Sequence, residues 1–165
     1  MPEPKQSPIR PTNDEARALA RNLIISARFG ALGVLEPKDG FPMVTRVAIG
    51  TAPDDGSPIT LISSLSAHTQ VLKHTPHASL LLGEPKDLGD PLTHPRITLQ
   101  CQTNFIDPTS ETHKKTRQHY LLTHPKSKLY IDFADFCFVR FSVQRAYLNG
   151  GFGKAFQLTA ADLTN

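Results

Sequence analysis

Residues 97–106 have the sequence ITLQCQTNFI, in which apolar and polar side chains alternate. One side of this run carries Ile97, Leu99, Cys101, Thr103 and Phe105, and the other carries Thr98, Gln100, Gln102 and Asn104. Because successive side chains of a strand point to opposite faces of its sheet, this period of two predicts a strand with one buried and one polar face. Residues 136–148 predict a second long strand of this kind. Long alternating strands favour an antiparallel barrel.

Four further apolar runs precede these two and predict further strands, at residues 30–35, 41–50, 59–63 and 78–83. Asp-Gly pairs between the first three of them favour hairpin turns. Apolar residues at helical spacing predict a helix from Asp14 to Ala27, and shorter helices are expected before Pro76 and after Ser110. The sum is a mainly β fold with flanking helices, and it lacks the regular strand–helix alternation of a doubly wound parallel sheet.

The composition narrows the class of protein. A chain of 165 residues corresponds to about one domain. Its net charge of +3 comes from scattered basic residues, which argues against a nucleic-acid-binding protein. No apolar run approaches the length of a transmembrane helix, so no membrane association is expected. Cys101 and Cys137 have no CxxC spacing and no export signal accompanies them, so we expect free thiols in a cytoplasmic protein.

A candidate anion site follows the strand at 59–63, in the sequence LISSLSAHT of residues 61–69. This run ends a strand and begins a helix. A helix N-terminus offers free backbone N–H groups and partial positive charge, which suit a phosphate. Ser66, His68 and Thr69 would add side-chain donors. The alternative is that one of these serines only caps the helix, a common role for serine at that position.

Three further features allow both a binding and a structural interpretation. Arg46 is a lone cation in an apolar strand and is either an anion ligand or a solvated exterior residue. Gln100 and Gln102 are suited either to bonding a heterocycle or to a solvated sheet face. The glycine-rich run Asn149–Ala155 allows close approach of a ligand or forms a flexible strand exit. The seven histidines show no zinc-ligand spacing, so no metal site is expected.

Six motifs, taken in order, resemble the pyridoxamine 5′-phosphate oxidase-like, FMN-binding split-barrel family. Within it, the haem-utilisation (haem-degrading) branch is the most similar. The motifs are FPMVTRV at 41–47, ITLISSLSAHT at 59–69, ASLLLGEP at 78–85, GDPLTHPR at 89–96, YL with HPK between 120 and 126, and LNGGFG at 148–153. Each motif alone is common, and their shared order carries the resemblance.

The resemblance implies a six-stranded antiparallel split β-barrel that works as a homodimer with FMN at the subunit interface. The first residues lack the apolar core of a secretory signal and predict a flexible N-terminal arm at 1–12, followed by one FMN-binding domain at 13–158 and a tail at 159–165. The flavin ring and ribityl chain would meet Arg46 and Val47, with Ile62, Ser63 and Ser64 lining the flavin and Ser66, His68 and Thr69 holding the phosphate. Gln100 and Gln102 would face the flavin, and Asn149 and Gly151 would approach from the other subunit.

The expected function is therefore that of an FMN-dependent oxidoreductase with a small-molecule substrate, and no catalytic residue is assigned. Two alternatives stay open: a haem-binding or haem-degrading protein of iron utilisation, and a non-catalytic flavin- or haem-binding module. Residues 156–165 lack the Arg and Pro with which the vitamin B6 branch binds its substrate. No histidine follows His124, whereas haem-degrading relatives carry an axial histidine in a C-terminal extension. FMN is accordingly the first expected cofactor and haem the second.

Overall fold

The computed structural model describes Met1 and residues 7–164. The strands are β1 (Ile9–Arg10), β2 (Phe29–Leu35), β3 (Pro42–Ala48), β4 (Gly50–Thr51), β5 (Pro58–Ser63), β6 (His77–Leu82), β7 (Arg96–Phe105), β8 (Phe136–Asn149) and β9 (Ala155–Thr159). The helices are α1 (Asp14–Ser26), α2 (Ala67–His74), α3 (Glu111–Thr123) and α4 (Ala160–Leu163), with short 3-10 turns at η1 (Pro91–Thr93) and η2 (Pro125–Leu129). Residues 2–6 of the expected arm and Asn165 of the expected tail lie outside the described residues.

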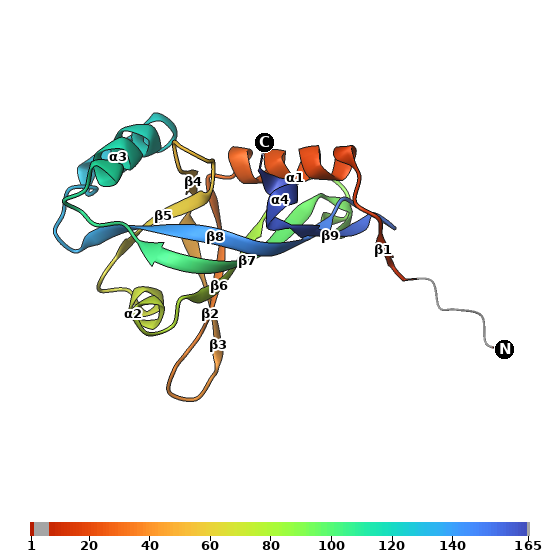
Figure 1. Ribbon diagram of the computed structural model, residues 1–165, viewed down its shortest axis with the longest axis horizontal. Helices are drawn as coiled ribbons and strands as arrows, with labels where there is room; N and C mark the ends of the chain where they lie inside the picture. Colours follow the sequence, from red (N-terminus) through yellow and green to blue (C-terminus); the bar gives the residue numbers. More distant parts are fainter. Residues whose placement is uncertain (2–6, 165) are drawn as a thin grey trace.

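The strands form one curled sheet in the order β1-β9-β8-β7-β6-β2-β3, and β5 joins it by pairing with β8. Every pair is antiparallel except β1 with β9. The six long strands are those predicted, so the mainly β fold with flanking helices is confirmed (Figure 1). The sheet does not close, because β3 and β5 approach each other without ladder pairing. The Thr60 hydroxyl crosses this split and donates to the carbonyl oxygen of Ala48 at 2.6 Å.

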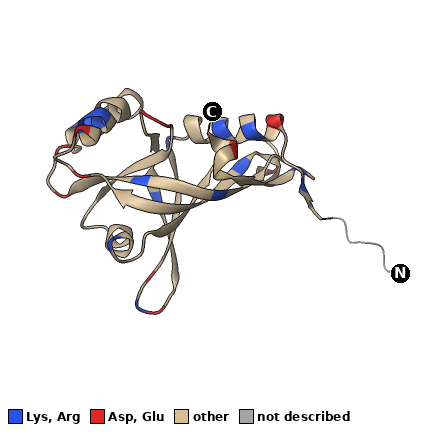
Figure 2. Ribbon diagram, viewed as in Figure 1, with Lys and Arg blue, Asp and Glu red and all other residues tan. Residues whose placement is uncertain are grey.

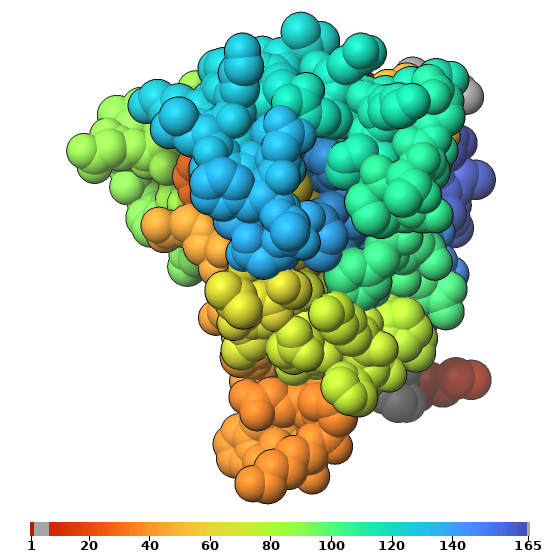
Figure 3. All heavy atoms as spheres, turned by 90° about the vertical axis from the view of Figure 1, so that its left-hand side faces the viewer, coloured from red at the N-terminus to blue at the C-terminus, as the bar shows by residue number. Residues whose placement is uncertain are grey.

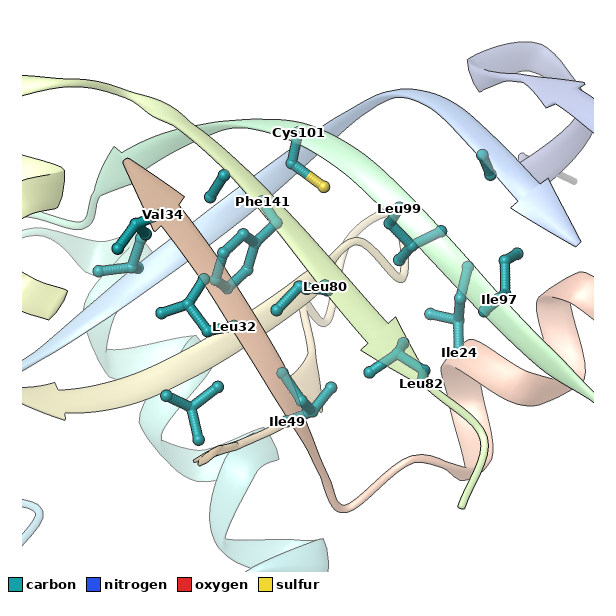
Figure 4. Close-up of a cluster of buried hydrophobic side chains, with 14 of the residues drawn as sticks. Ile24, Leu32, Val34, Ile49, Leu80, Leu82, Ile97, Leu99, Cys101 and Phe141 are labelled. Atoms are coloured by element: carbon teal, nitrogen blue, oxygen red, sulfur yellow. The ribbon is translucent and has the colours of Figure 1, made fainter. Parts of the chain in front are cut away.

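The main core lies inside the curl of the sheet. Leu32, Leu80, Leu99 and Phe141 are fully buried there and come from four different strands. Figure 4 shows their side chains pointing toward one another, with Ile24 of α1 closing one end. Alternation explains this core, since residues 97, 99, 101 and 103 of β7 are all buried. Phe105 was expected on the same buried side but is partly exposed, because β7 ends there.

A second, smaller core lies between β5 and the α3–η2 segment. It contains Ile59, Leu61, Tyr120 and Phe138, and it explains why β5 is buried on both faces instead of alternating. Tyr120 lies so close to Gly50 that a Cβ there would come within 2.8 Å of the tyrosine ring. Glycine is therefore required at position 50 for α3 to dock on β4.

Near its two ends the chain forms two strands and a short helix that the hydrophobic periodicity of the sequence did not predict. β1 pairs with β9, and α4 follows β9 directly. Asp162 anchors α4 to α1 by accepting a hydrogen bond from Arg17 Nε at 2.8 Å. Strands of two residues and a helix of one turn are too short for a hydrophobic period to show.

Candidate cofactor-binding site

The junction between β5 and α2 is fixed by hydrogen bonds from the predicted hydroxyl residues. Ser63 Oγ donates to Asp135 Oδ2 at 2.7 Å, and Ser64 N donates to the Asp135 carbonyl at 2.6 Å. Thr69 is fully buried, and its Oγ1 donates to the Ser63 carbonyl at 2.6 Å. Ser63 and Thr69 therefore hold the turn, and the hydroxyl of Thr69 is not directed at a ligand. Asp135 was not predicted, because it lies 72 residues beyond Ser63 in the sequence.

Ser66 stands at the N-cap of α2, where its hydroxyl makes no cap hydrogen bond. An N-cap serine normally accepts from a backbone N–H of the first turn, so this hydroxyl is free for another partner. The first turn of α2 contains no Lys or Arg, and the basic residues of the helix lie in its last turn. Figure 3 shows α2, in yellow-green, between the orange β2–β3 hairpin and the α3–η2 segment in teal and blue.

His68 links α2 to β3. Its Nδ1 lies 3.0 Å from Thr45 Oγ1, at hydrogen-bond distance, while its Nε2 is buried without a partner among the described residues. Burial lowers the pKa of His68 because desolvation penalises the charged ring. The lowered pKa favours the neutral ring of His68 in this structure.

Acid is expected to destabilise the fold through His68. Its folded pKa is lowered, so the unfolded chain binds the proton more readily, and stability falls as pH drops below the ordinary value of 6.5. Urea unfolding at pH 7.5 and 5.5 measures this loss. A His68→Asn variant should lose less stability between the two pH values than the wild type. His74→Asn, at an exposed position on the same helix, is the matched control. An equal loss in His68→Asn and wild type would contradict the expectation.

The two apolar residues expected to touch the flavin point inward. Val47 and Ile62 belong to the main core and are 5% and 4% exposed. Their side chains pack within the barrel, which leaves their backbone groups to meet a ligand. Arg46 points the other way and is exposed, with its guanidinium carbon 5.7 Å from the centre of the Phe29 ring. Within the described residues it has no hydrogen bond or ion pair, so its charge is free for an anion.

Arg46 lies on what we call the outer face, formed by the outward side chains of β3, β2, β6, β7 and β8. One row across this face follows the strand register through Arg46, Ala31, Leu81, Thr98 and Tyr147. The neighbouring row runs through Val44, Gly33, Ser79, Gln100 and Arg145. At about 4.8 Å per strand, Arg46 and Gln100 of one chain are roughly 15 Å apart. One chain therefore does not bring these two predicted residues together.

Gln100 and Gln102 line a groove of about 620 Å³ at one end of the outer face. We call it the β2–β6–β7 groove. Arg145 also lines it, with Nε donating to Oε1 of Gln100, and His77 lies at the start of β6. Neither Arg145 nor His77 was predicted as a site residue. Strand pairing reveals both, since Gln100 lies opposite Arg145 and Gln102 opposite His77.

Asn149 and Gly151 lie at the far end of β8 from the β5–α2 junction. Ser63 pairs with Phe136 at one end of β8, whereas Asn149 is the last residue of that strand. Gly151 N donates to Asn149 Oδ1 at 3.0 Å, and Gly151 has φ +121°, which favours glycine. Within one chain this segment and the β5–α2 junction do not form one site.

The outer face is positively charged. The six long strands contain Arg46, Arg96, Arg140 and Arg145 and no Asp or Glu (Figure 2). Arg140 is neutralised by Asp54 and Asp55, at 2.7 and 2.6 Å. The other three arginines form no salt bridge within the described part of the chain. Unpaired arginines attract anions, and their planar guanidinium matches a carboxylate or phosphate.

The outer face is also apolar to an unusual degree. It exposes large hydrophobic side chains from the adjacent strands β3, β2 and β6 and from β8, which lies beyond β7, namely Phe29, Leu35, Val44, Leu81 and Tyr147. Contiguous exposed apolar surface marks an interaction site in soluble proteins.

No three His, Cys, Asp or Glu side chains gather as a metal site among the residues described. Cys101 is buried, and burial raises the pKa of its thiol to about 12, which makes it unreactive.

A comparison with protein families matches residues 11–165 to the family described as CREG, β-barrel. The chain belongs to the CREG β-barrel family. The chain is 32% identical over 138 residues to the non-canonical, chloroplastic haem oxygenase HOZ of Arabidopsis thaliana, covering 82% of this chain and 40% of HOZ. The chain thus spans about two fifths of the length of this curated relative.

Solved structures extend the comparison. A haem-binding protein from Mycobacterium smegmatis is 28% identical with a TM-score of 0.81, over 94% of this chain and 61% of that protein. A pyridoxinephosphate oxidase family protein from Clostridium acetobutylicum, related to general stress protein 26, has a TM-score of 0.66 at 14% identity, over 92% and 99%. This second match shows the split-barrel fold alone. The resemblance to the oxidase-like split barrels and their haem-utilisation branch is confirmed. None of the described helices is long and apolar enough to cross a membrane.

Proposed function

We propose that this chain binds haem on its outer face, between two copies of itself. The observation that carries the proposal is the composition of that face. It combines exposed apolar side chains with Arg46, Arg96 and Arg145, none of which has a carboxylate partner in the described structure. Haem is a flat apolar macrocycle with two carboxylates, so its chemistry complements such a face.

The comparisons support haem ahead of flavin, which reverses the order expected from the sequence. HOZ is a haem oxygenase and the mycobacterial protein binds haem, and both share 28–32% identity with this chain. The phosphate position expected for FMN also lacks a lysine or arginine in the first turn of α2. The carboxylate of Asp135 lies at the same junction and would repel a phosphate.

A homodimer follows from the same face. The five exposed apolar residues would be covered by a second copy, and a two-fold interface presents the same patch on both subunits. A second chain would also supply Asn149 and Gly151 to the Arg46 end of the face, which one chain does not do. The free cysteines accord with the proposed cytoplasmic location.

Titration of the purified protein with haemin tests the proposal. We expect a saturable Soret band with one haem per chain and a dissociation constant in the micromolar range or below. Iron-free protoporphyrin is the matched probe, and it should bind more weakly because it offers no metal to a side chain. A Soret absorbance that rises without saturation would contradict specific haem binding.

FMN is a second candidate, favoured by three unpartnered groups on β3 and α2. These are the guanidinium of Arg46, the hydroxyl of Ser66 and the buried Nε2 of His68. They suit a phosphate or a flavin edge, and bound FMN would supply hydride or single-electron transfer. The chain would then position the flavin as an oxidoreductase acting on a small molecule. Its own residues would bind and orient the cofactor, and no proton-transfer residue is assigned.

Replacing Arg46 by alanine should weaken FMN binding by about 1.5–3 kcal/mol if the guanidinium donates a charge-assisted hydrogen bond to the flavin or its phosphate. Quenching of flavin fluorescence on titration measures the affinity. Lys38→Ala removes the same charge from the exposed β2–β3 turn and controls for net charge. An unchanged dissociation constant in Arg46→Ala would remove Arg46 from the site, and a protein that takes up no FMN would exclude this candidate.

A further inference from the structure

The β2–β6–β7 groove contains a histidine whose position the function proposed above does not yet use. We infer that the imidazole of His77 is the axial ligand of the haem iron, with the macrocycle lying in this groove. The inference rests on the proposed haem binding and adds to it the ligand, the groove and the orientation of the carboxylates. Imidazole nitrogen is a common protein ligand of iron in haem.

His77 differs from the other six histidines because it alone lines this groove. All seven histidines lie in the described part of the chain, and each of the other six has a structural contact. Ring nitrogens are at hydrogen-bond distance from protein groups in His68, His74, His94, His119 and His124, whereas His113 packs edge-on against Phe138. His77 is exposed, lines the groove and has no hydrogen bond within the described residues. Its ring is free to bind a metal.

The wall of the groove beside β6 is apolar. It is formed by Gly33 and Leu35 of β2 and by Pro42 of β3. Position 33 carries no side chain on the outer face, and a Cβ built there would meet no atom closer than 3.8 Å. A planar macrocycle can therefore lie directly against the backbone of β2. The groove volume of about 620 Å³ is also within the range typical of small-molecule and cofactor sites.

The other wall of the groove supplies positive charge. Arg145 is held by one hydrogen bond from its Nε to Gln100, which leaves its two terminal nitrogens to donate elsewhere. The described residues that line the groove include no Asp or Glu. A haem liganded by His77 would thus find a guanidinium for a propionate. The groove combines an imidazole, an apolar wall and an unpaired cation, and these match the iron, the ring and the carboxylates of haem.

Haemin titration of His77→Ala tests the inference by spectroscopy. We expect the Soret maximum to shift, the electron paramagnetic resonance signal of the histidine-ligated iron to disappear, and the dissociation constant to rise at least tenfold. Added imidazole should restore the wild-type spectrum by replacing the lost ligand, an effect that a purely structural role would not produce. His74→Ala, three residues away and outside the groove, should retain the wild-type spectrum and affinity. Because His77 is exposed, circular dichroism should show an unchanged fold.

A second variant tests the groove itself. Gly33→Leu would fill the apolar wall, and we expect at least a tenfold loss of haemin affinity with the fold retained. Three outcomes overturn the inference. If histidine ligation survives in His77→Ala, or if Gly33→Leu binds haemin as the wild type does, the iron lies elsewhere although haem binding itself stands. If wild-type protein binds no haemin, both the inference and the proposed function fail.

Discussion

Replacing Leu81 by aspartate is expected to convert the proposed homodimer into monomers. Leu81 is on β6, the central strand of the outer face, with β2 on one side and β7 on the other. Its side chain is 46% exposed in one chain and would be covered by the second copy. A two-fold interface contains position 81 of both subunits, so it would bury two carboxylates without partners. Burying an unpaired charge makes the free energy of dimerisation less favourable. We expect the dimer dissociation constant to rise at least ~100-fold, or about 2.7 kcal/mol.

Sedimentation equilibrium over a range of protein concentrations measures this change. Leu122→Asp is the matched control, since Leu122 is 78% exposed on α3 and lies away from the outer face. The control should remain dimeric. Haemin affinity should fall together with dimerisation in Leu81→Asp if haem binds between the two copies. A wild-type protein that is monomeric at high concentration would contradict the proposed assembly, and so would a Leu81→Asp protein that dimerises normally.

Replacing Phe141 by alanine is expected to lower the free energy of unfolding by about 3–5 kcal/mol, because it removes a large buried side chain and leaves a cavity. Phe141 is 0% exposed and lies in the middle of the main core (Figure 4). Domains of this kind are stable by only about 5–15 kcal/mol, so the loss would be a large fraction of the total.

Urea unfolding should show a lower midpoint for Phe141→Ala with an unchanged slope, since the surface exposed on unfolding stays nearly the same. Phe152→Ala is the control. Phe152 is 86% exposed in the loop after β8, so its truncation should change stability by less than about 0.5 kcal/mol. Equal midpoints for Phe141→Ala and wild type would mean that the barrel interior is not packed as described.

The strand pattern of this chain was predictable because it is local. A period of two in residues 97–106 is enough to place a strand and to choose its buried face, and the structure buries Leu99 and leaves Gln102 exposed. The Asp-Gly turns were predictable for the same reason, since Gly40 and Gly56 adopt the positive φ that such turns need. Phe105 was misplaced, because alternation does not reveal where the neighbouring strands stop.

The candidate site was less predictable, because its residues are assembled by strand pairing. The motif at 61–69 located a strand–helix junction correctly, but Thr69 is buried within it and Ser63 is bonded to Asp135. No sequence motif marked Arg145 or His77 as a binding residue, since each is a single polar residue within the sequence of a strand. They became site candidates once β7 placed Gln100 and Gln102 opposite them.

By itself, the sequence determined six strands, the buried face of the strand at 97–106 up to Thr103, the flanking helices and an excess of basic residues, since each follows from neighbouring side chains or from composition. The tertiary structure decided which residues share a surface. Strands from distant parts of the chain lie about 4.8 Å apart in the sheet, so Arg46, Leu81 and Arg145 share one outer face although 99 residues separate the first from the last. That juxtaposition is fixed by register, and register depends on the whole packed barrel.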